Sequence, residues 1–349
     1  MRRVTTLAAA ILAATLVLTS CGGDDETTTE PKADGETSAP ASDIKVGLAY
    51  DIGGRGDQSF NDAAAAGLDK AKAEFGIETK EAEATGGEAE SAKEERLRAL
   101  ASAGFNPVIA VGFAYSAAVA KVAKELPDTQ FAIIDDEAAV GDNIANLVFA
   151  EEQGSFLVGA AAALKSESDN IGFVGGVDVP LIHKFEAGYA AGAKEVNPDI
   201  KVQVKYLTQP PDFSGFGDPA KGKTAAAGMF DAGADVVYQA AGGSGGGVFE
   251  AAQDAGGFAI GVDSDQYNTA DPTVRDVIIT SMIKKVDVAV YDFISTVVDG
   301  NFTAGTVTYD LEKDGVGYST TGGAIDDITD KLDDYKQQII DGSITVPTE

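Results

Sequence analysis

Polar and aromatic side chains follow the first predicted strand of this chain. Residues 57–61 read Asp-Gln-Ser-Phe-Asn and lead into an Ala-rich helix. An aromatic ring beside carboxylate, hydroxyl and amide groups offers a stacking face together with hydrogen-bond donors and acceptors, which a flat heterocycle requires. The same segment is also compatible with a loop that ends in a helix-capping residue. The candidate ligand contacts in this segment are Asp57, Ser59, Phe60 and Asn61.

Two carboxylates lie directly after other apolar strands. Asp135 follows residues 131–134, and Asp263 follows residues 259–262. A carboxylate at the end of a strand can accept hydrogen bonds from ligand N–H groups or from two vicinal hydroxyls, as a sugar site requires. For Asp135 and its neighbour Asp136, a solvated turn and a pair of metal ligands are the alternatives.

Three further segments supply candidate contacts. Gly242 and Gly245 lie in a Gly-rich run that follows a strand and opens a helix. Because no Gly-Lys-Ser/Thr follows, this run is not a phosphate loop; its glycines either let the backbone approach a ligand or make the turn. Lys284 places a cation at the end of an apolar strand. Phe185 stands four residues before Tyr189, a spacing that is also typical of the core face of a helix.

Composition disfavours most hydrolytic and metal chemistry. The chain has 349 residues, with 26 Lys+Arg against 56 Asp+Glu and a formal charge of −30. Such a balance argues against nucleic-acid polymers and anionic lipid surfaces as partners. A single Cys excludes internal disulfides and multi-Cys metal sites, and a single His (His183) disfavours zinc sites and a Ser-His-Asp triad. We expect no catalytic residues, no metal and no cofactor.

From residue 44 onward, β-branched runs alternate with Ala-rich helical stretches, which indicates parallel sheets covered on both faces. The predicted strands are 45–50, 108–111, 131–134, 171–174, 201–207, 236–239, 259–262, 277–282 and 305–311. The predicted helices are 61–75, 88–103, 116–125, 154–165, 182–196, 217–231, 247–255, 285–298 and 325–340.

The number of predicted strands is larger than one ordinary doubly wound sheet contains. The fold class we predict is therefore α/β, with two doubly wound parallel-sheet lobes and a ligand cleft between them. The first lobe is expected to comprise residues 44–151 plus about 268–305. The second is expected to comprise residues 152–267 plus about 306–341, followed by a tail at 342–349.

The N-terminus predicts export and anchoring. Residues 1–20 combine two arginines with an apolar run, as in a secretory signal, and the run is too short to span a membrane. Leu18-Thr19-Ser20-Cys21 resembles the bacterial lipobox, whose Cys is lipidated. Residues 22–43 are polar and acidic, so we expect a disordered tether. The expected location is the extracytoplasmic face of the cell membrane, reached only through the lipid anchor.

Five sequence blocks, taken in order, resemble the basic membrane protein family of substrate-binding lipoproteins, which includes purine nucleoside receptors. They are Asp57-Gln-Ser-Phe-Asn61, Gly172-Phe-Val-Gly-Gly176 with Pro180 and Phe185-Glu-Ala-Gly188, Gly242-Gly-Ser-Gly245, Gly261-Val-Asp263-Ser-Asp265-Gln, and Thr280-Ser-Met-Ile-Lys284.

The resemblance implies a periplasmic-binding-protein-like fold of type I, with two lobes joined by three crossovers. It further implies a nucleoside between the lobes, with purine nucleosides as the favoured class, and an ABC permease with its ATPase subunits as partners. We expect a monomer.

The resemblance also implies roles for single residues. Phe60 would stack on the base and Asn61 would hydrogen-bond it, while Phe185 would supply the second stacking face. Asp135 would accept hydrogen bonds from the edge of the base. Asp263 would accept the ribose hydroxyls and Lys284 would donate to the same sugar, with Lys285 as the alternative.

Two other functions compete with nucleoside binding. One is a sugar-binding protein of the same fold, in which aromatic stacking and Asp263 would serve a hexose. The other is an enzyme such as a nucleoside hydrolase, which needs a cluster of metal-binding aspartates. Asp51, Asp57 and Asp62 offer such a cluster only superficially, because they are spread over a Gly-rich loop and a helix start.

Overall fold

The computed structural model describes residues 43–349, all of which belong to one compact unit of the chain. The predicted signal segment, Cys21 and all of the predicted tether except Asp43 lie outside the described residues. None of the helices between residues 43 and 349 is long and apolar enough to cross a lipid bilayer.

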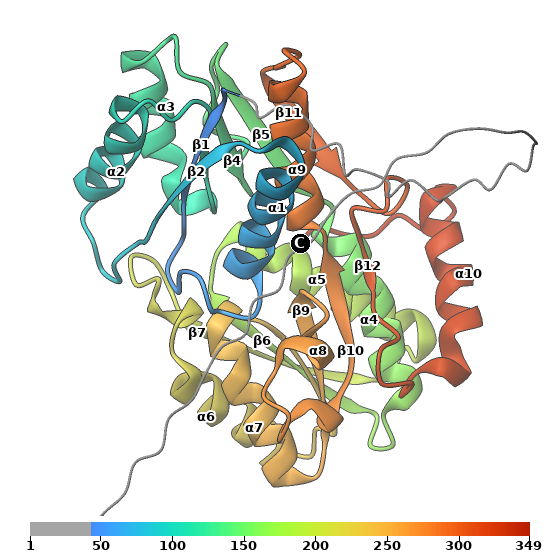
Figure 1. Cartoon of the computed structure of the whole chain (residues 1–349). Coiled ribbons are helices and arrows are strands. Elements are labelled where there is room, and N and C mark those ends of the chain that lie inside the picture. Colours follow the sequence, from blue (N-terminus) through green and yellow to red (C-terminus); the bar gives the residue numbers. More distant parts are fainter. Residues whose placement is uncertain (1–42) are drawn as a thin grey trace, which may run out of the picture. The chain divides into compact units, whose positions relative to one another are not determined.

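The first of two six-stranded sheets is parallel throughout, with the strand order β11-β5-β4-β3-β1-β2 (Figure 1). Its inner strands are apolar and buried, whereas β2 at one edge has the sequence Glu-Thr-Lys-Glu-Ala and is largely exposed. The strands are β1 (Lys45–Ala49), β2 (Glu78–Ala82), β3 (Val108–Ala110), β4 (Phe131–Ile134), β5 (Ile144–Phe149) and β11 (Gly305–Tyr309).

Helices cover both faces of this sheet. On one face α1 (Phe60–Phe75) and α9 (Val286–Val298) pack against each other and against the Val46 and Leu48 side of β1. On the other face α2 (Glu90–Ser102) and α3 (Ser116–Glu125) pack against the Ala49 side. Successive residues of β1 thus enter two different cores, because side chains alternate across a strand.

The second sheet has the order β12-β10-β9-β8-β6-β7 and is parallel except for β12, which runs antiparallel to β10. Its strands are β6 (Asn170–Val177), β7 (Lys201–Thr208), β8 (Val236–Ala240), β9 (Phe258–Asp263), β10 (Ile278–Lys284) and β12 (Val316–Tyr318). The two sheets confirm the predicted architecture of two α/β lobes.

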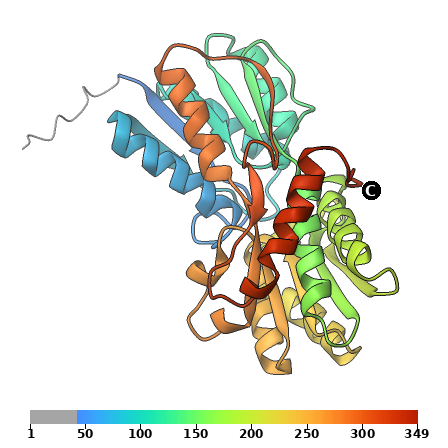
Figure 2. The same cartoon turned by 90° about the vertical axis from the view of Figure 1, so that its right-hand side faces the viewer.

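The helices of the second lobe again lie on both faces of the sheet. One group packs around the core that contains Phe173 and Tyr238, and α10 lies against α4 (Figure 2). A second group packs around Val174 and Val237. The helices are α4 (Glu151–Lys165), α5 (Pro180–Val196), α6 (Pro219–Asp231), α7 (Gly245–Ala255), α8 (Gln266–Thr269) and α10 (Thr329–Ile340).

Short 3-10 turns complete the second lobe and the loop after β3. They are η1 (Phe113–Tyr115), η2 (Ser214–Phe216), η3 (Gly242–Ser244), η4 (Arg275–Val277) and η5 (Asp326–Ile328). Two of these turns, η1 and η2, carry aromatic side chains toward the site described below.

The chain passes between the sheets three times: from β5 to β6, from β10 to β11, and from β11 to β12. The predicted division of the C-terminal third was wrong at two strands. β10 was expected in the first lobe but pairs with β9, and β11 was expected mainly in the second lobe but pairs with β5. The reason is that α9, which packs on α1, carries the chain back to the first sheet only after β10 has ended.

Most other elements form where the sequence predicts them, with small differences at their ends, but β2, β5 and β12 were not predicted. β2 lacks an apolar run because it is an edge strand, where charged side chains discourage pairing with another chain. β12 has only three residues and pairs with the distant β10.

Helices α4 and α5 touch through their backbones. A Cβ on Gly188 would collide with the carbonyl of Glu152, and one on Gly192 would collide with the carbonyl of Phe156. Gly159 of α4 meets the carbonyl of Tyr189 in the same way. Close approach of the two helices therefore depends on these glycines, and it fixes the first turns of α4 and α5, which carry side chains of the site.

We predict that Gly192→Ala lowers the free energy of unfolding by about 1–3 kcal/mol, because the helices must move apart. The matched control is Gly228→Ala in α6, where an added Cβ meets no atom within 4 Å. That change should stabilise the protein by about 0.5–1 kcal/mol, since only the helix propensity differs. Urea unfolding of both variants measures the contrast, and equal effects would contradict the packing argument.

Candidate functional site

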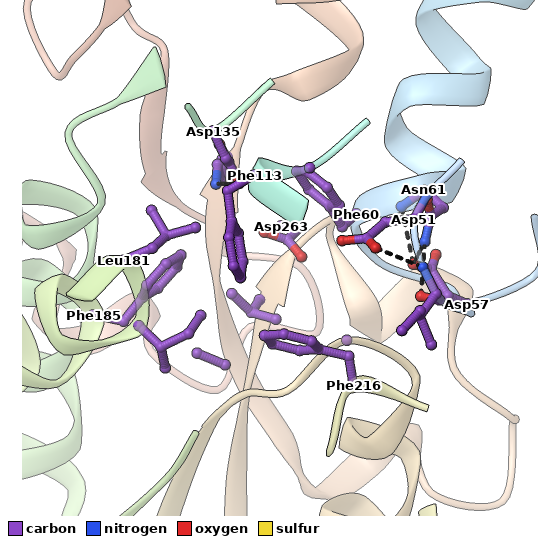
Figure 3. A pocket seen from close by; sticks show the side chains of 17 residues that line it. Asp51, Asp57, Phe60, Asn61, Phe113, Asp135, Leu181, Phe185, Phe216 and Asp263 are labelled. Carbon is purple, nitrogen blue, oxygen red and sulfur yellow. Dashed lines mark hydrogen bonds and ion pairs between the residues drawn. The ribbon is translucent and has the colours of Figure 1, made fainter. Parts of the chain in front are cut away.

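A pocket lies at the carboxyl ends of the strands and takes side chains from both lobes (Figure 3). Ligands of doubly wound folds bind at this end of the sheet. Eight of the ten ligand-binding residues predicted from the sequence line it: Asp57, Phe60, Asn61, Asp135, Phe185, Gly242, Asp263 and Lys284.

Four phenylalanine rings form much of the pocket wall. Phe60 at the start of α1 and Phe113 of η1 come from the first lobe, whereas Phe185 of α5 and Phe216 of η2 come from the second. Phe113 and Phe216 were not predicted from the sequence, because they lie in turns that carry no recognisable motif. The ring of Phe216 covers Gly176, where a Cβ would collide with it, so this glycine is what admits the ring.

Most polar groups of Asp57 and Asn61 form hydrogen bonds within the loop before α1 or with the residues that flank it. The Asp57 carboxylate accepts from the backbone N–H groups of Ser59, Asn61 and Asp62 at 2.9–3.1 Å, and from Asn61 Nδ2 at 3.0 Å. Asn61 Oδ1 in turn accepts from the N–H of Asp51 at 3.0 Å. Burial raises the pKa of Asp57, and these hydrogen bonds oppose the rise. Both residues therefore shape the pocket wall.

Asp51 lies two residues after the end of β1. From the sequence it was considered only as part of a possible metal cluster. Its carboxylate points toward Phe60 and the middle of the pocket (Figure 3). Oδ1 accepts from the N–H of Ile52 at 2.8 Å, and the other oxygen lies against Gly112, where no Cβ could fit. Burial raises the pKa of Asp51 to about 6. Its place after a strand was the signal that could have identified it.

The aspartates near the N-terminal loop do not converge as a metal site would require. Asp62 accepts from the N–H groups of Gly56 and Gln58, at 2.7 and 2.9 Å, just as Asp57 accepts from its own loop. Within residues 43–349 no group of three or more Asp, Glu, His or Cys side chains could hold a metal ion.

A buried ion-pair cluster occupies another side of the pocket. Lys284 Nζ lies 2.6 Å from Asp135 Oδ2 and 3.0 Å from Glu151 Oε1, and the Lys284 side chain is 1% exposed. The rings of Phe60, Phe149 and Phe185 surround the ammonium group at 5.0–5.4 Å. Lys285 was the alternative to Lys284, but it pairs with Asp314 at the surface.

The electrostatics of this cluster favour a charged lysine. Burial alone would lower the pKa of Lys284, but Asp135, Glu151 and Asp263 reverse the effect and raise it. Burial raises the pKa of Asp135 to about 7; Lys284 opposes that rise and Glu151 adds to it. The Asp135 Oδ1 atom is buried and has no hydrogen-bond partner among the described residues.

Asp263 and Asp135 share an unusual backbone conformation. Each directly ends or follows its strand with a positive φ, 63° and 65° respectively, which is uncommon for residues other than glycine. Strained backbone of this kind concentrates at functional sites, where the surrounding structure holds it in place. Burial raises the pKa of Asp263 to about 6.

Two predicted ligand contacts, Ser59 and Gly245, do not line the pocket. Ser59 is fully buried, and its Oγ donates to Asp263 Oδ2 at 2.5 Å, so it links the lobes beneath the pocket wall. Gly245 faces the carboxamide of Gln239, with which a Cβ would collide. Both predictions are corrected for the same reason: neighbours from distant segments take up the space that a ligand would need.

The pocket is rich in hydrogen-bond acceptors. Its lining includes the carboxylates of Asp51, Asp135 and Asp263. The one basic side chain that lines it, among the described residues, is Lys284. Carboxylates accept hydrogen bonds and repel anions, so this arrangement favours a neutral ligand with several N–H and O–H groups. The aromatic rings favour a ligand that also carries a flat face.

Two α/β lobes joined by three chain connections, with a pocket at the carboxyl ends of their strands, define a two-lobed substrate-binding protein. Residues 44–349 match the family model Bmp, described as ABC transporter substrate-binding protein PnrA-like. The chain belongs to this family, so it is a binding protein of an ABC transporter and not an enzyme.

Relatives cover almost the whole chain. It is 35% identical to the ABC transporter nucleoside-binding protein BmpA of Lactococcus lactis, over 100% of this chain and 99% of that protein. It is also 35% identical to the CD4+ T-cell-stimulating antigen of Listeria innocua, over 97% and 96% of the two chains. An uncharacterized lipoprotein of Pyrococcus abyssi is 36% identical over 81% of this chain and 70% of that protein.

Solved structures agree with the fold. An ABC transporter solute-binding protein from Aeropyrum pernix superposes with a TM-score of 0.76 at 30% identity, covering 88% of this chain and 94% of that one. A solute-binding protein from Conexibacter woesei superposes with a TM-score of 0.70, covering 87% and 99%; at 23% identity, this match supports the fold alone.

The raised pKa values predict how stability depends on pH. Asp51, Asp135 and Asp263 bind protons more tightly in the folded chain than in the unfolded chain. Their contribution to stability is therefore complete in acid below about pH 4 and is lost as the pH rises to about 7. We expect the melting temperature of the ligand-free protein to fall across this interval.

Asp263→Asn separates this effect from the general repulsion of an acidic protein. It should raise the melting temperature more at pH 8 than at pH 5, because it removes a buried charge that exists only at the higher pH. Asp199→Asn changes the net charge equally at an exposed position. Identical shifts for the two variants at both pH values would show that burial of Asp263 has no such effect.

Proposed function

We propose that this protein binds a nucleoside, specifically a purine nucleoside, between its two lobes and delivers it to an ABC permease. The observation that carries the proposal is the combination, in one pocket, of aromatic rings from both lobes with four pocket-lining carboxylates and a buried lysine. The nucleoside-binding function printed in the name of the Lactococcus lactis relative supports it.

The base stacks on Phe60 in this proposal, against a ring from the second lobe. Phe185, predicted from the sequence, and Phe216, revealed by the structure, are the two rings that the second lobe offers. Stacking of a base on an aromatic side chain contributes about 1–3 kcal/mol. A base held by rings from both lobes also favours closure, because those contacts exist together only when the lobes meet.

The carboxylates divide between two sides of the pocket. Asp51, Asp57 and Asn61 lie on one side in Figure 3, and Asp135 lies on the other. Asp263 and Asp135 are close enough to Lys284 to change its pKa. We assign the ribose to Asp263 and Lys284, and the N–H groups of the base to carboxylates, with Asp135 as predicted from the sequence and Asp51 added by the structure.

The same proposal includes the predicted cell location. Cys21 carries the lipid, and this lipid is the protein's only attachment to the membrane. The protein acts as a monomer on the extracytoplasmic face. The acidic chain has no role in binding nucleic-acid polymers. The printed description of the Pyrococcus abyssi relative as a lipoprotein supports the anchor.

A sugar-binding protein of the same fold is the second candidate. Asp263 and Lys284 suit a hexose as well as a ribose, and one aromatic ring is enough to stack on a sugar face. Four phenylalanines in one pocket favour a larger flat group. A thermal-shift panel of adenosine, guanosine, inosine, ribose and galactose separates the two: stabilisation by the sugars alone would overturn the nucleoside proposal.

We predict that Asp263→Ala weakens nucleoside binding by about 1.5–3 kcal/mol, since a charged acceptor for the ribose hydroxyls is lost. The wild-type protein should discriminate between a nucleoside and its 2′-deoxy analogue, and the variant should not. Isothermal titration calorimetry with each pair of ligands measures both effects.

Ser59→Ala is the matched control, because it removes the hydroxyl bonded to Asp263 but leaves the carboxylate in the pocket. It should retain discrimination against the deoxy analogue. If both variants discriminate as well as the wild type does, Asp263 has no contact with the ribose.

Replacement of Cys21 tests the anchor. We expect Cys21→Ala to move the protein from the membrane fraction to the soluble fraction, because it removes the lipid attachment point. Fractionation after a salt wash, followed by immunoblotting, checks the result; a variant that stays with the membrane would exclude Cys21 as the anchor.

A further inference from the structure

A buried carboxylate lies just outside the pocket and has an unusual environment. Glu151 is 1% exposed, yet neither of its carboxylate oxygens has a hydrogen-bond partner among the described residues. Its ion-pair partners among the described residues are two lysines: Lys284 Nζ at 3.0 Å and Lys184 Nζ at 3.6 Å. Glu151 does not line the pocket, and no sequence motif pointed to it.

Of these two lysines, Lys284 is the closer and the more buried ion-pair partner of Glu151. The side chain of Lys184 is 34% exposed, so water screens its interaction. Lys284 is buried, and a buried carboxylate tolerates its loss of hydration only beside a cation of this kind. The dependence is mutual, because Glu151 also helps to raise the pKa of Lys284.

The geometry around Lys284 shows what Glu151 does. Lys284 makes a hydrogen bond to Oδ2 of Asp135 at 2.6 Å, whereas its contact with Glu151 is an ion pair without hydrogen-bond geometry. The second oxygen of Asp135, Oδ1, is left without a partner in a residue that lines the pocket. Attraction to Glu151 holds the ammonium group to one side of Asp135.

Without that attraction, Asp135 would be the nearest remaining anion for the ammonium group. An ammonium carries three N–H donors and can lie across both oxygens of one carboxylate. It would then occupy Oδ1, and a ligand donor would have to displace it.

We propose that Glu151 is a positioning residue for ligand binding, which acts through Lys284 to keep Asp135 Oδ1 open to a donor group of the ligand. The proposal rests on the nucleoside-binding function proposed above. Glu151 begins α4 at the first connection between the lobes, and Lys284 ends β10 at the second. The contact therefore also fixes the ammonium group relative to both connections.

Glu151→Gln tests the proposal with almost no change in shape. We expect it to weaken binding of the nucleoside that the wild type binds best in the panel above by ten-fold or more. The matched control is Glu152→Gln, the next residue, which loses the same charge but makes no ion pair within residues 43–349. It should change the affinity less than two-fold.

A double-mutant cycle separates positioning from a general structural effect. In a Lys284→Met background, Glu151→Gln should no longer weaken binding, because Glu151 acts only through the lysine. An effect of the same size in both backgrounds would overturn the proposal.

A readout without ligand keeps the proposal testable if Lys284→Met does not fold or if no nucleoside binds. The buried Lys284 ammonium group should give a slowly exchanging ¹⁵N–¹H signal, assigned by its loss in Lys284→Arg. Glu151→Gln should shift this signal and Glu152→Gln should not; an unmoved signal would refute the proposal. Failure of the wild type to bind any nucleoside would instead refute the proposed function.

Discussion

The buried ion pair between Lys284 and Asp135 is the interaction on which the pocket depends. It joins the end of β10 in the second sheet to the residue after β4 in the first, and both side chains are almost fully buried. Burial of two charges costs more free energy than their attraction returns unless the geometry is good and further charges support it. Here Glu151 and three aromatic rings surround the ammonium group. The pair is therefore better understood as a device for holding a defined geometry than as a source of stability.

In the loop before α1, half-buried carboxylates are stabilised by backbone N–H groups instead of by a lysine. Asp57 and Asp62 accept hydrogen bonds from the N–H groups of their own loop, which fixes the start of α1 and with it Phe60. Ser59 and Gln58 then reach the second lobe, through Asp263 and Gln266. Polar residues in this loop thus position an aromatic ring and connect the lobes, while Phe60 and Asp51 face the pocket.

Sequence patterns located most of the site because carboxyl ends of parallel strands converge. Asp135, Asp263 and Lys284 each end or follow an apolar strand, and the structure brings them together. Direction of a side chain was harder to predict. Ser59 sits between two pocket residues in the sequence but points away, since its hydroxyl is taken by a residue 204 positions later.

Residues outside such patterns were missed for physical reasons. Glu151 begins a helix, where an acidic residue is ordinarily explained by the helix dipole, and its partner lies on a strand far along the chain. Phe113 and Phe216 lie in short turns without periodicity. The strand β11 was given to the wrong lobe because its pairing with the distant β5 leaves no local signal. The strand β10 pairs with the preceding β9, and the sequence did not reveal that the chain returns to the first sheet only after β10.

The return of the chain to both sheets after residue 304 has a consequence for biosynthesis. β11 and β12 complete the two sheets, and Ile339 and Leu332 enter the cores of the first and the second lobe. A nascent chain that ends before these segments has an unfinished edge on each sheet and an uncovered patch in each core. Neither lobe is therefore complete without the last segments of the chain, and a polypeptide that lacks them has no finished lobe to fold into.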